Sequence, residues 1–353
     1  MLVSAPKRNR HYKLFLSARL SRDATPRNQE AEKPSASAFL NPLESSAAME
    51  VFEGAEFVRL RSLEHGTYLH AAEDGRGVLL DARRASHHAA WAVQRLQASG
   101  GGGGRGTRHV LLRGVYGRYL GAPDPRWSLL PCRRRAATQR DRDEREIQAI
   151  MWRAVGTGAS AGVVLLHDAH GRYLRANWRR LPCRSGVAVA GGGCLGPTMQ
   201  WAVEVIPWTH ARPELPITSV SEWVKLFDWA CAPLASVRRW VWRTSQQREI
   251  RWVRANDSGN FSEEDWASFQ YSGRSTILLR SELAHLTLQF YRLMVCIRAG
   301  RHGQPTPLVT DLPRSREPLD IVVLRAHARA ADQFIFPDVD KETASPAVEG
   351  VFL

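Results

Sequence analysis

Between residues 49 and 208, polar and apolar side chains alternate over short stretches of strand length. Residues 59–61 and 91–93 follow this period of two, and turn-forming residues recur every eight to twelve positions. No apolar period of 3.6 residues persists there over the length of a helix. The pattern therefore predicts a domain built mainly of short β-strands.

A short motif occurs three times in this region. It reads Leu-Arg-Ser-Leu-Glu-His-Gly-Thr-Tyr-Leu-His-Ala at 60–71, Leu-Arg-Gly-Val-Tyr-Gly-Arg-Tyr-Leu-Gly-Ala at 112–122 and Leu-His-Asp-Ala-His-Gly-Arg-Tyr-Leu-Arg-Ala at 166–176, and a tryptophan follows each copy. In this Gly-x-Tyr-Leu motif the glycine suits a hairpin position with positive φ, and the leucine is expected in the core. The tyrosine is expected to pack against a turn with its hydroxyl in contact with water. The residues predicted to form this repeated core are Gly66, Tyr68, Leu69, Trp91, Gly117, Tyr119, Leu120, Trp152, Gly171, Tyr173, Leu174 and Trp201.

The spacing of the copies predicts how the strands assemble. A second shared pattern, at 127–133 and 178–184, recurs 51 residues apart, and residues 80–83 fill the same slot in the first copy. Three units of about 50 residues with about four strands each predict a β-trefoil, because two units would not close and more would form a solenoid or propeller. The motif is interpreted as scaffold, and binding is expected where the lobes differ. These positions are the loops after Leu80, Leu130 and Leu181.

A second domain is predicted after a linker. The pattern resumes with a strand at 249–255, a helix at 275–285 with an N-cap serine, and strands at 293–297, 307–310 and 319–324. This order, close to ββαββ, predicts a small α+β domain, for which a ubiquitin-like arrangement is one candidate. The tail after Ala331 is expected to be loop. The predicted divisions are an extension at 1–48, the trefoil at 49–208, a linker at 209–247, the α+β domain at 248–328 and the tail at 329–353.

Two segments do not fit this organisation. Residues 1–48 lack a sustained apolar period and are expected to be unstructured. The first 22 residues hold six Lys/Arg and no acidic residue, as in a transit peptide, but we favour an over-extended gene model that really starts at Met49. The tryptophan-rich stretch at 223–242 is interpreted either as a helix between the domains or as a gene-prediction artefact.

The cysteines and the net charge bear on location and partners. Five cysteines without a Cys-x-x-Cys pair predict reduced thiols and a cytoplasmic protein, with organelle targeting by residues 1–22 as the alternative.

Of the formal net charge of +14, residues 49–208 contribute most, with 23 arginines, no lysine and 14 acidic residues. Such a domain attracts polyanions, although a solvated arginine-rich surface has the same composition. The charged run at 140–146 is expected to be a solvated loop. Six arginines that follow the same slot in each lobe form the candidate binding surface, namely Arg83, Arg84, Arg133, Arg134, Arg135 and Arg184.

Residues 49–62 and the Gly-x-Tyr-Leu motifs resemble the plant family called domain of unknown function 569, classed with the fascin-like, actin-cross-linking β-trefoils. Residues 269–276 and 296–303 resemble the second part of its longer members. The resemblance covers 49–208 and about 248–340. It implies the fold and the class of protein, and no active-site residue can be transferred from it.

The remaining motifs argue against catalysis. The chain has no His-Glu-x-x-His and no phosphate loop ending in Gly-Lys-Ser/Thr. We therefore expect no catalytic residue, no cofactor and no metal, and a protein that is not an enzyme. The Gln-x-Trp signature of ricin-type trefoils is absent, since Ala89, Ile150 and Met199 stand two before the lobe tryptophans.

The expected function is accordingly a binding or scaffold protein with actin or another acidic protein as partner. Carbohydrate binding is kept as the alternative. Nucleic acid would use the same arginines but without interleaved exposed aromatics, and ranks lower. No run of about 18 uncharged apolar residues predicts a membrane span.

Overall fold

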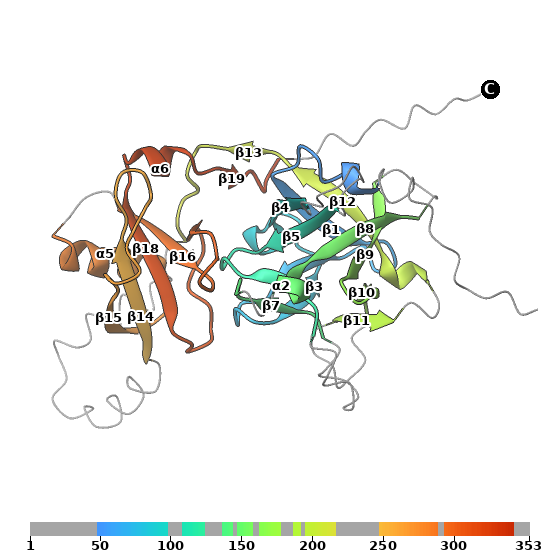
Figure 1. Cartoon of the computed structure of the whole chain (residues 1–353), viewed down its shortest axis with the longest axis horizontal. Coiled ribbons are helices and arrows are strands. Elements are labelled where there is room, and N and C mark those ends of the chain that lie inside the picture. The colour runs from blue at the N-terminus through green and yellow to red at the C-terminus, as the bar shows by residue number, and fades with distance from the viewer. Residues whose placement is uncertain are drawn as a thin grey trace, which may run out of the picture. The chain divides into compact units, whose positions relative to one another are not determined.

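The computed structural model describes residues 48–97, 108–123, 136–143, 147–157, 162–177, 186–191, 195–216, 247–288 and 293–341. Within the described residues, no helix is long and apolar enough to cross a membrane. The trefoil and the C-terminal domain belong to one compact unit, and Figure 1 shows their strands and helices.

Within its described residues, the first domain has twelve strands, four in each of three lobes. The first and fourth strands of the lobes pair in the closed cycle β1-β4-β5-β8-β9-β12, which β12 completes by pairing with β1. The second and third strands form the hairpins β2–β3, β6–β7 and β10–β11. This is the predicted β-trefoil. Its strands are β1 Phe57–Ser62, β2 Tyr68–Ala71, β3 Val78–Asp81, β4 Trp91–Gln97, β5 Arg108–Arg113, β6 Tyr119–Gly121, β7 Thr138–Arg140, β8 Trp152–Gly156, β9 Val163–Asp168, β10 Arg172–Ala176, β11 Val187–Gly191 and β12 Gln200–Ile206.

A short helical turn stands before the tryptophan of every lobe. These turns are η1 His87–Ala89, α2 Ile147–Ile150 and η4 Pro197–Met199. Each tryptophan is fully buried, and its indole Nε1 donates a hydrogen bond to the backbone oxygen of the motif leucine in the same lobe. The three N···O distances are 3.0, 2.9 and 3.0 Å. The same hydrogen bond therefore joins the second and fourth strands of each lobe.

The motif glycines have the predicted backbone conformation. Gly66, Gly117 and Gly171 have φ values of 65°, 73° and 69°, where a Cβ atom would be strained. The expectation of a wet tyrosine hydroxyl is wrong for Tyr119, which is fully buried. Its hydroxyl lies 3.1 Å from Gln94 Oε1, and the Arg142 guanidinium lies 6.0 Å from its ring centre, so neighbouring side chains replace the water.

As far as the structure describes it, the second domain is a five-stranded sheet with one long helix. The sheet order is β15-β14-β18-β16-β17, with β14 and β18 parallel. Helix α5 buries Leu279 and Leu283 against apolar residues of the sheet, and Ser275 caps it as predicted, accepting a hydrogen bond from the Leu278 amide. This is a ubiquitin-like α+β arrangement. Its elements are β14 Gln247–Arg254, β15 Ala267–Ser272, α5 Thr276–Leu286, β16 Leu293–Arg298, β17 Thr306–Pro307 and β18 Leu319–Arg325.

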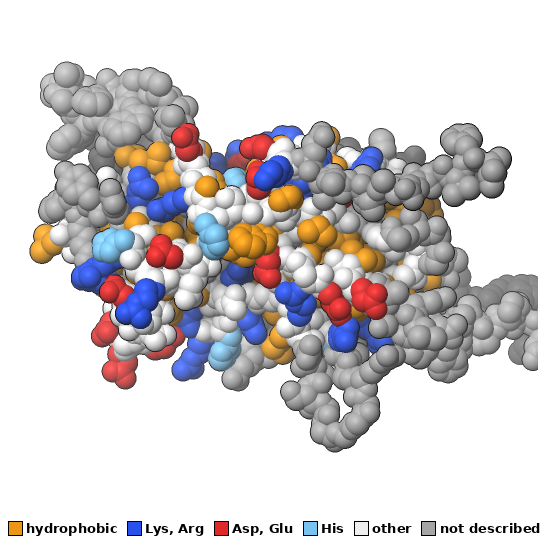
Figure 2. All heavy atoms as spheres, turned by 90° about the horizontal axis from the view of Figure 1, so that it is seen from above, with side chains coloured by type: hydrophobic (Ala, Val, Ile, Leu, Met, Phe, Trp, Pro, Cys, Tyr) orange, Lys and Arg blue, Asp and Glu red, His pale blue; other side chains and the backbone are white. Residues whose placement is uncertain are grey.

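The tail after Ala331 is not all loop, which corrects the prediction. After α6 Arg329–Asp332, strand β19 Phe336–Pro337 pairs with β13 Trp208–Thr209, the strand that follows the trefoil. The buried Arg59 donates a hydrogen bond to the backbone oxygen of Val339, and Val339 packs against trefoil residues. Figure 2 shows hydrophobic side chains gathered on the face that carries β13 and β19. The sequence does not predict this pairing, because a strand of two residues is too short to show a period and the two strands are far apart in the chain.

Candidate functional site

Arg118 is the centre of the junction between the two domains. It follows Gly117 in the second Gly-x-Tyr-Leu motif, and its side chain is 8% exposed. Nη1 donates to Gly75 O in the first lobe, Nε to Asp141 Oδ1 in the second lobe, and Nη2 to Glu317 Oε2 in the C-terminal domain. All three distances are 2.8 Å. One guanidinium therefore joins two lobes and the second domain.

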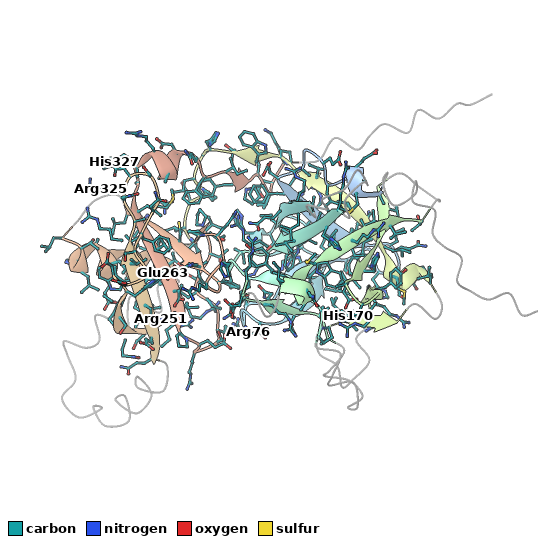
Figure 3. The ribbon with its side chains drawn as sticks, viewed as in Figure 1. Arg76, His170, Arg251, Glu263, Arg325 and His327 are labelled. Carbon is teal, nitrogen blue, oxygen red and sulfur yellow. The ribbon has the colours of Figure 1, made fainter. Side chains whose placement is uncertain are left out.

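Arg76, in the turn between β2 and β3, binds the same two carboxylates. Its Nε lies 2.9 and 2.8 Å from the two oxygens of Glu317, and its Nη1 lies 3.2 Å from Asp141 Oδ2. Figure 3 labels Arg76 among the side chains. Burial raises the pKa of Glu317, but the hydrogen bonds from Arg76 and Arg118 outweigh burial and leave that pKa below its ordinary value. The carboxylate is thus held ionised between two arginines.

A second acidic residue of the trefoil binds two arginines of the C-terminal domain. Glu73 Oε2 lies 2.9 Å from Arg314 Nε and 3.3 Å from Arg274 Nη2. The Arg314 amide also donates to Glu73 O at 2.6 Å. At the junction, trefoil arginines therefore bind a carboxylate of the C-terminal domain, and arginines of the C-terminal domain bind a carboxylate of the trefoil.

The charged run at 140–146 is not a solvated loop where the structure describes it. The Arg142 amide donates to Ala299 O, and the His302 amide donates to Arg142 O, both at 3.0 Å. The Arg301 amide donates to Asp143 Oδ1 at 2.8 Å. Asp143 and the backbone of Arg142 thus have partners in the C-terminal domain, whereas the Asp141 carboxylate and the Arg142 guanidinium have theirs within the trefoil. These contacts replace water.

The second of the three motif turns packs against the C-terminal domain. A Cβ atom on Gly117 would lie 3.2 Å from Ile297 O and 3.3 Å from Thr306 Oγ1. A Cβ atom on Gly171 would meet nothing within 4 Å, and one on Gly66 would meet only Arg61 at 3.7 Å. The motif was interpreted purely as scaffold, but in lobe two its turn is also a contact surface.

Two of the six candidate surface arginines lie within the described residues. Arg83 follows β3, is 69% exposed, and pairs with Asp81 at 3.1 Å. Hydrogen bonds from Arg83 are the main cause that lowers the pKa of Asp81 to about 2. Arg84 pairs with Glu204 of β12 at 3.3 Å. Arg133, Arg134, Arg135 and Arg184 lie outside the described residues, so the predicted surface stays a prediction.

The sequence analysis missed Arg76, Arg118 and Glu317. A signal for Arg118 was present, because lobes two and three both read Gly-Arg-Tyr-Leu. The equivalent Arg172 donates to Pro123 O of the preceding lobe at 2.8 Å, as Arg118 does to Gly75 O. The repeated arginine thus links neighbouring lobes. Glu317 has no local signal, since it is 199 residues from Arg118.

In the described part of the chain, no group of three His, Cys, Asp or Glu side chains is placed to hold a metal ion. The thiol of Cys296 is free and fully buried, and burial raises its pKa to about 12. It therefore stays protonated at neutral pH.

Two family models match the chain. Residues 49–204 match a β-trefoil domain of unknown function (DUF569), and residues 246–324 match the DUF569 associated ubiquitin-like domain. No curated protein sequence matches the chain.

Solved structures resemble the trefoil part. The designed 3-fold symmetric protein ThreeFoil is 18% identical, with a TM-score of 0.31, and the match covers 42% of this chain and 97% of that chain. A Macrolepiota procera ricin B-like lectin in complex with lactose is 12% identical, with a TM-score of 0.30 and coverage of 42% and 94%. A Caenorhabditis elegans protein with unknown function is 15% identical, with a TM-score of 0.29 and coverage of 42% and 93%. Similarity this low carries no information about a ligand.

Proposed function

We propose that this chain is a non-enzymatic scaffold protein whose trefoil binds acidic protein surfaces through arginines. It carries a DUF569 β-trefoil domain followed by a DUF569 associated ubiquitin-like domain. The supporting observation is the junction itself. Arg76 and Arg118 hold the carboxylate of Glu317 from the second domain at 2.8 Å. The trefoil thus already binds one protein domain by the chemistry that the proposal extends to a partner.

Arginine is suited to this role. Its planar guanidinium offers several donors in a fixed fork that matches a carboxylate, and it keeps its charge when partly buried. The trefoil region has 23 arginines, no lysine and 14 acidic residues, so it keeps an excess of positive charge. An acidic partner would approach such a surface faster and in a preferred orientation. Actin, an acidic filament, is the candidate partner.

Co-sedimentation with filamentous actin tests this proposal. We expect the full chain to sediment with actin at low salt and to dissociate as salt is raised, because exposed ion pairs are screened. Two variants, Arg83→Ser with Arg84→Ser, and Arg133→Ser with Arg134→Ser and Arg135→Ser, should each weaken binding. Arg325→Ser in the C-terminal domain, where Arg325 is 42% exposed, serves as the matched control.

The outcomes test separately whether actin is the partner and whether arginines bind acidic surfaces in general. Absence of co-sedimentation at low salt would reject actin. The same proteins are then passed over immobilised polyglutamate, and retention that neither arginine variant reduces would reject arginine-based binding of acidic surfaces. Retention on immobilised glycans that these substitutions leave unchanged would instead favour carbohydrate binding.

A further inference from the structure

A cavity of about 280 Å³ lies between the trefoil and the C-terminal domain. Strands β4 and β5 form one wall, and residues 304–309 and 333–337 form the others. Most of the walls are apolar. The main apolar side chains are Phe57, Val93, Val115, Val309, Phe334 and Phe336.

Arg113, the last residue of β5, is the cationic side chain in this wall. Its Nη1 donates to the side-chain and backbone oxygens of Gln304 at 3.2 and 3.4 Å, and its Nε has no hydrogen-bond partner among the described residues. Gln304 Oε1 also accepts a 2.6 Å hydrogen bond from Gln94 Nε2. The partners that the structure gives the Arg113 side chain are therefore the amide oxygens of Gln304 and the Tyr119 hydroxyl, and none of them is a carboxylate.

No carboxylate balances the charge of Arg113 in the described part of the chain. Burial lowers the pKa of Arg113, and nearby Arg142 lowers it further. The groups that raise it are Tyr119 and Cys296, and neither is a carboxylate. The acidic residue in the cavity wall, Glu56, pairs with Arg95 at 3.5 Å. Arg113 as a whole is partly buried, but its Nε is buried, and buried cationic groups in proteins ordinarily have an anionic partner.

We propose that this cavity binds a small organic carboxylate with an apolar body. The carboxylate would lie against the Arg113 guanidinium, whose donors match its two oxygens, and the body would contact the apolar walls. The volume is at the low end of ligand cavities, which fits a compact molecule and excludes a folded polypeptide. This small-molecule site is separate from the proposed binding of acidic proteins and does not depend on it.

Phenylacetate is the probe, and acetate and phenylacetamide are its controls. Acetate lacks the apolar body, and phenylacetamide lacks the charge. We expect millimolar phenylacetate to raise the melting temperature of the full chain and to give a titration in calorimetry, and both controls to have much smaller effects. Equal effects of phenylacetamide and phenylacetate, or no effect of phenylacetate, would overturn the proposal.

Arg113→Met removes the charge but keeps the length of the side chain. We expect it to weaken phenylacetate binding by about 10- to 100-fold, the effect of losing a hydrogen bond to a charged group. The ligand-free variant should melt at or above the wild-type temperature, because a partly buried charge with no anionic partner among the described residues has been removed. Arg108→Met is the matched control, at the other end of β5 and outside the lining of this cavity.

A second variant keeps Arg113 and fills the space. Ala92 lines the cavity and pairs with Arg113 across β4 and β5, so Ala92→Phe would place a ring beside the guanidinium. We expect it to abolish phenylacetate binding without removing the charge. Unchanged binding in both Arg113→Met and Ala92→Phe would show that phenylacetate binds elsewhere.

Discussion

At the scale of single residues, the lobe tryptophans combine packing with a hydrogen bond. Trp91, Trp152 and Trp201 are fully buried, and each donates from Nε1 to the motif leucine's backbone oxygen. A buried carbonyl and a buried N–H that lost this bond would both be unsatisfied. The tryptophans therefore hold the lobes in register as well as filling the core.

Replacing Trp152 should destabilise the trefoil strongly. Trp152→Ala is expected to lower the free energy of unfolding by about 3–5 kcal/mol, and Leu120→Ala by about 2–5 kcal/mol, because both leave a cavity in the core. Trp152→Phe keeps most of the volume but loses the indole donor, and should cost about 1–3 kcal/mol. Urea unfolding measures all three. Near-native stability of Trp152→Ala would mean that the core assignment is wrong.

His70 makes stability depend on pH. Its side chain is buried, and Nε2 lies 2.9 Å from Arg83 O. Burial lowers the pKa of His70 from 6.5 to about 4. Between these values the unfolded chain binds a proton that the folded chain does not, so stability is fully present above pH 6.5 and is lost as pH falls toward 4. Burial also lowers the pKa values of His87 and His88, so these two residues likewise make the protein less stable as the pH falls.

The pH profile of unfolding tests this effect. A pKa difference of this size corresponds to at most about 3 kcal/mol. His70→Gln, whose amide can still donate to Arg83 O, should remove most of the slope between pH 6.5 and 4. His170→Gln, at a more exposed position labelled in Figure 3, is the control. An unchanged slope in His70→Gln would contradict the assignment.

At the scale of elements, the three motif turns are equivalent in backbone but not in surroundings. Gly117→Ala and Gly171→Ala should both cost about 1–2 kcal/mol, because alanine is strained at positive φ. Gly117→Ala should cost more, because its Cβ meets Ile297 O and Thr306 Oγ1, whereas the space beside Gly171 is open.

Melting temperature and hydrogen exchange measure this difference. Only Gly117→Ala should also speed amide exchange in β16, which contains Ile297. Equal losses in the two variants, with β16 unaffected, would mean that the turn does not support the second domain.

Elements with a repeated or periodic pattern were predictable from the sequence, and elements fixed by distant contacts were not. Positive φ at Gly66 and its equivalents, and the Ser275 cap of α5, follow from local steric and hydrogen-bonding rules. Strand β19 needs only two residues, and Tyr119 is buried by Gln94 and other side chains that no local pattern reveals. The junction depends on pairs up to 241 residues apart, such as Arg76 with Glu317.

At the scale of the whole molecule, part of the arginine content serves the junction. Arg76 and Arg118 bind Glu317, and Arg274 and Arg314 bind Glu73. The positive charge counted in the sequence is thus not all available to a partner. An external acidic surface would therefore bind to arginines outside the junction, such as Arg83, whose ion pair is with Asp81 of its own turn.

Removing the charge of Glu317 should weaken the junction. Glu317→Gln leaves Arg118, nearly buried, with Asp141 as its remaining carboxylate, and should lower stability by about 1–2 kcal/mol. The loss should shrink at high salt, since the Glu317 side chain is 38% exposed. Asp320→Asn, which removes the partner of Arg251 within the C-terminal sheet, should cost no more than about 1 kcal/mol. Urea unfolding at two salt concentrations compares them, and equal losses would contradict a special role for Glu317.

The pairing of β13 with β19 gives the C-terminal domain two tethers instead of one. The chain leaves the trefoil at Trp208 and returns beside it at Phe336, so both ends of the intervening segment are fixed near the same place. A two-residue pairing is weak alone, but the short distance keeps the effective concentration of the second domain high. A chain nicked between residues 216 and 247 loses this advantage, but the contacts of Glu317, Arg314 and Val339 with the trefoil should still keep its halves associated through gel filtration. Cutting the linker would then break the chain but leave the two domains bound to each other.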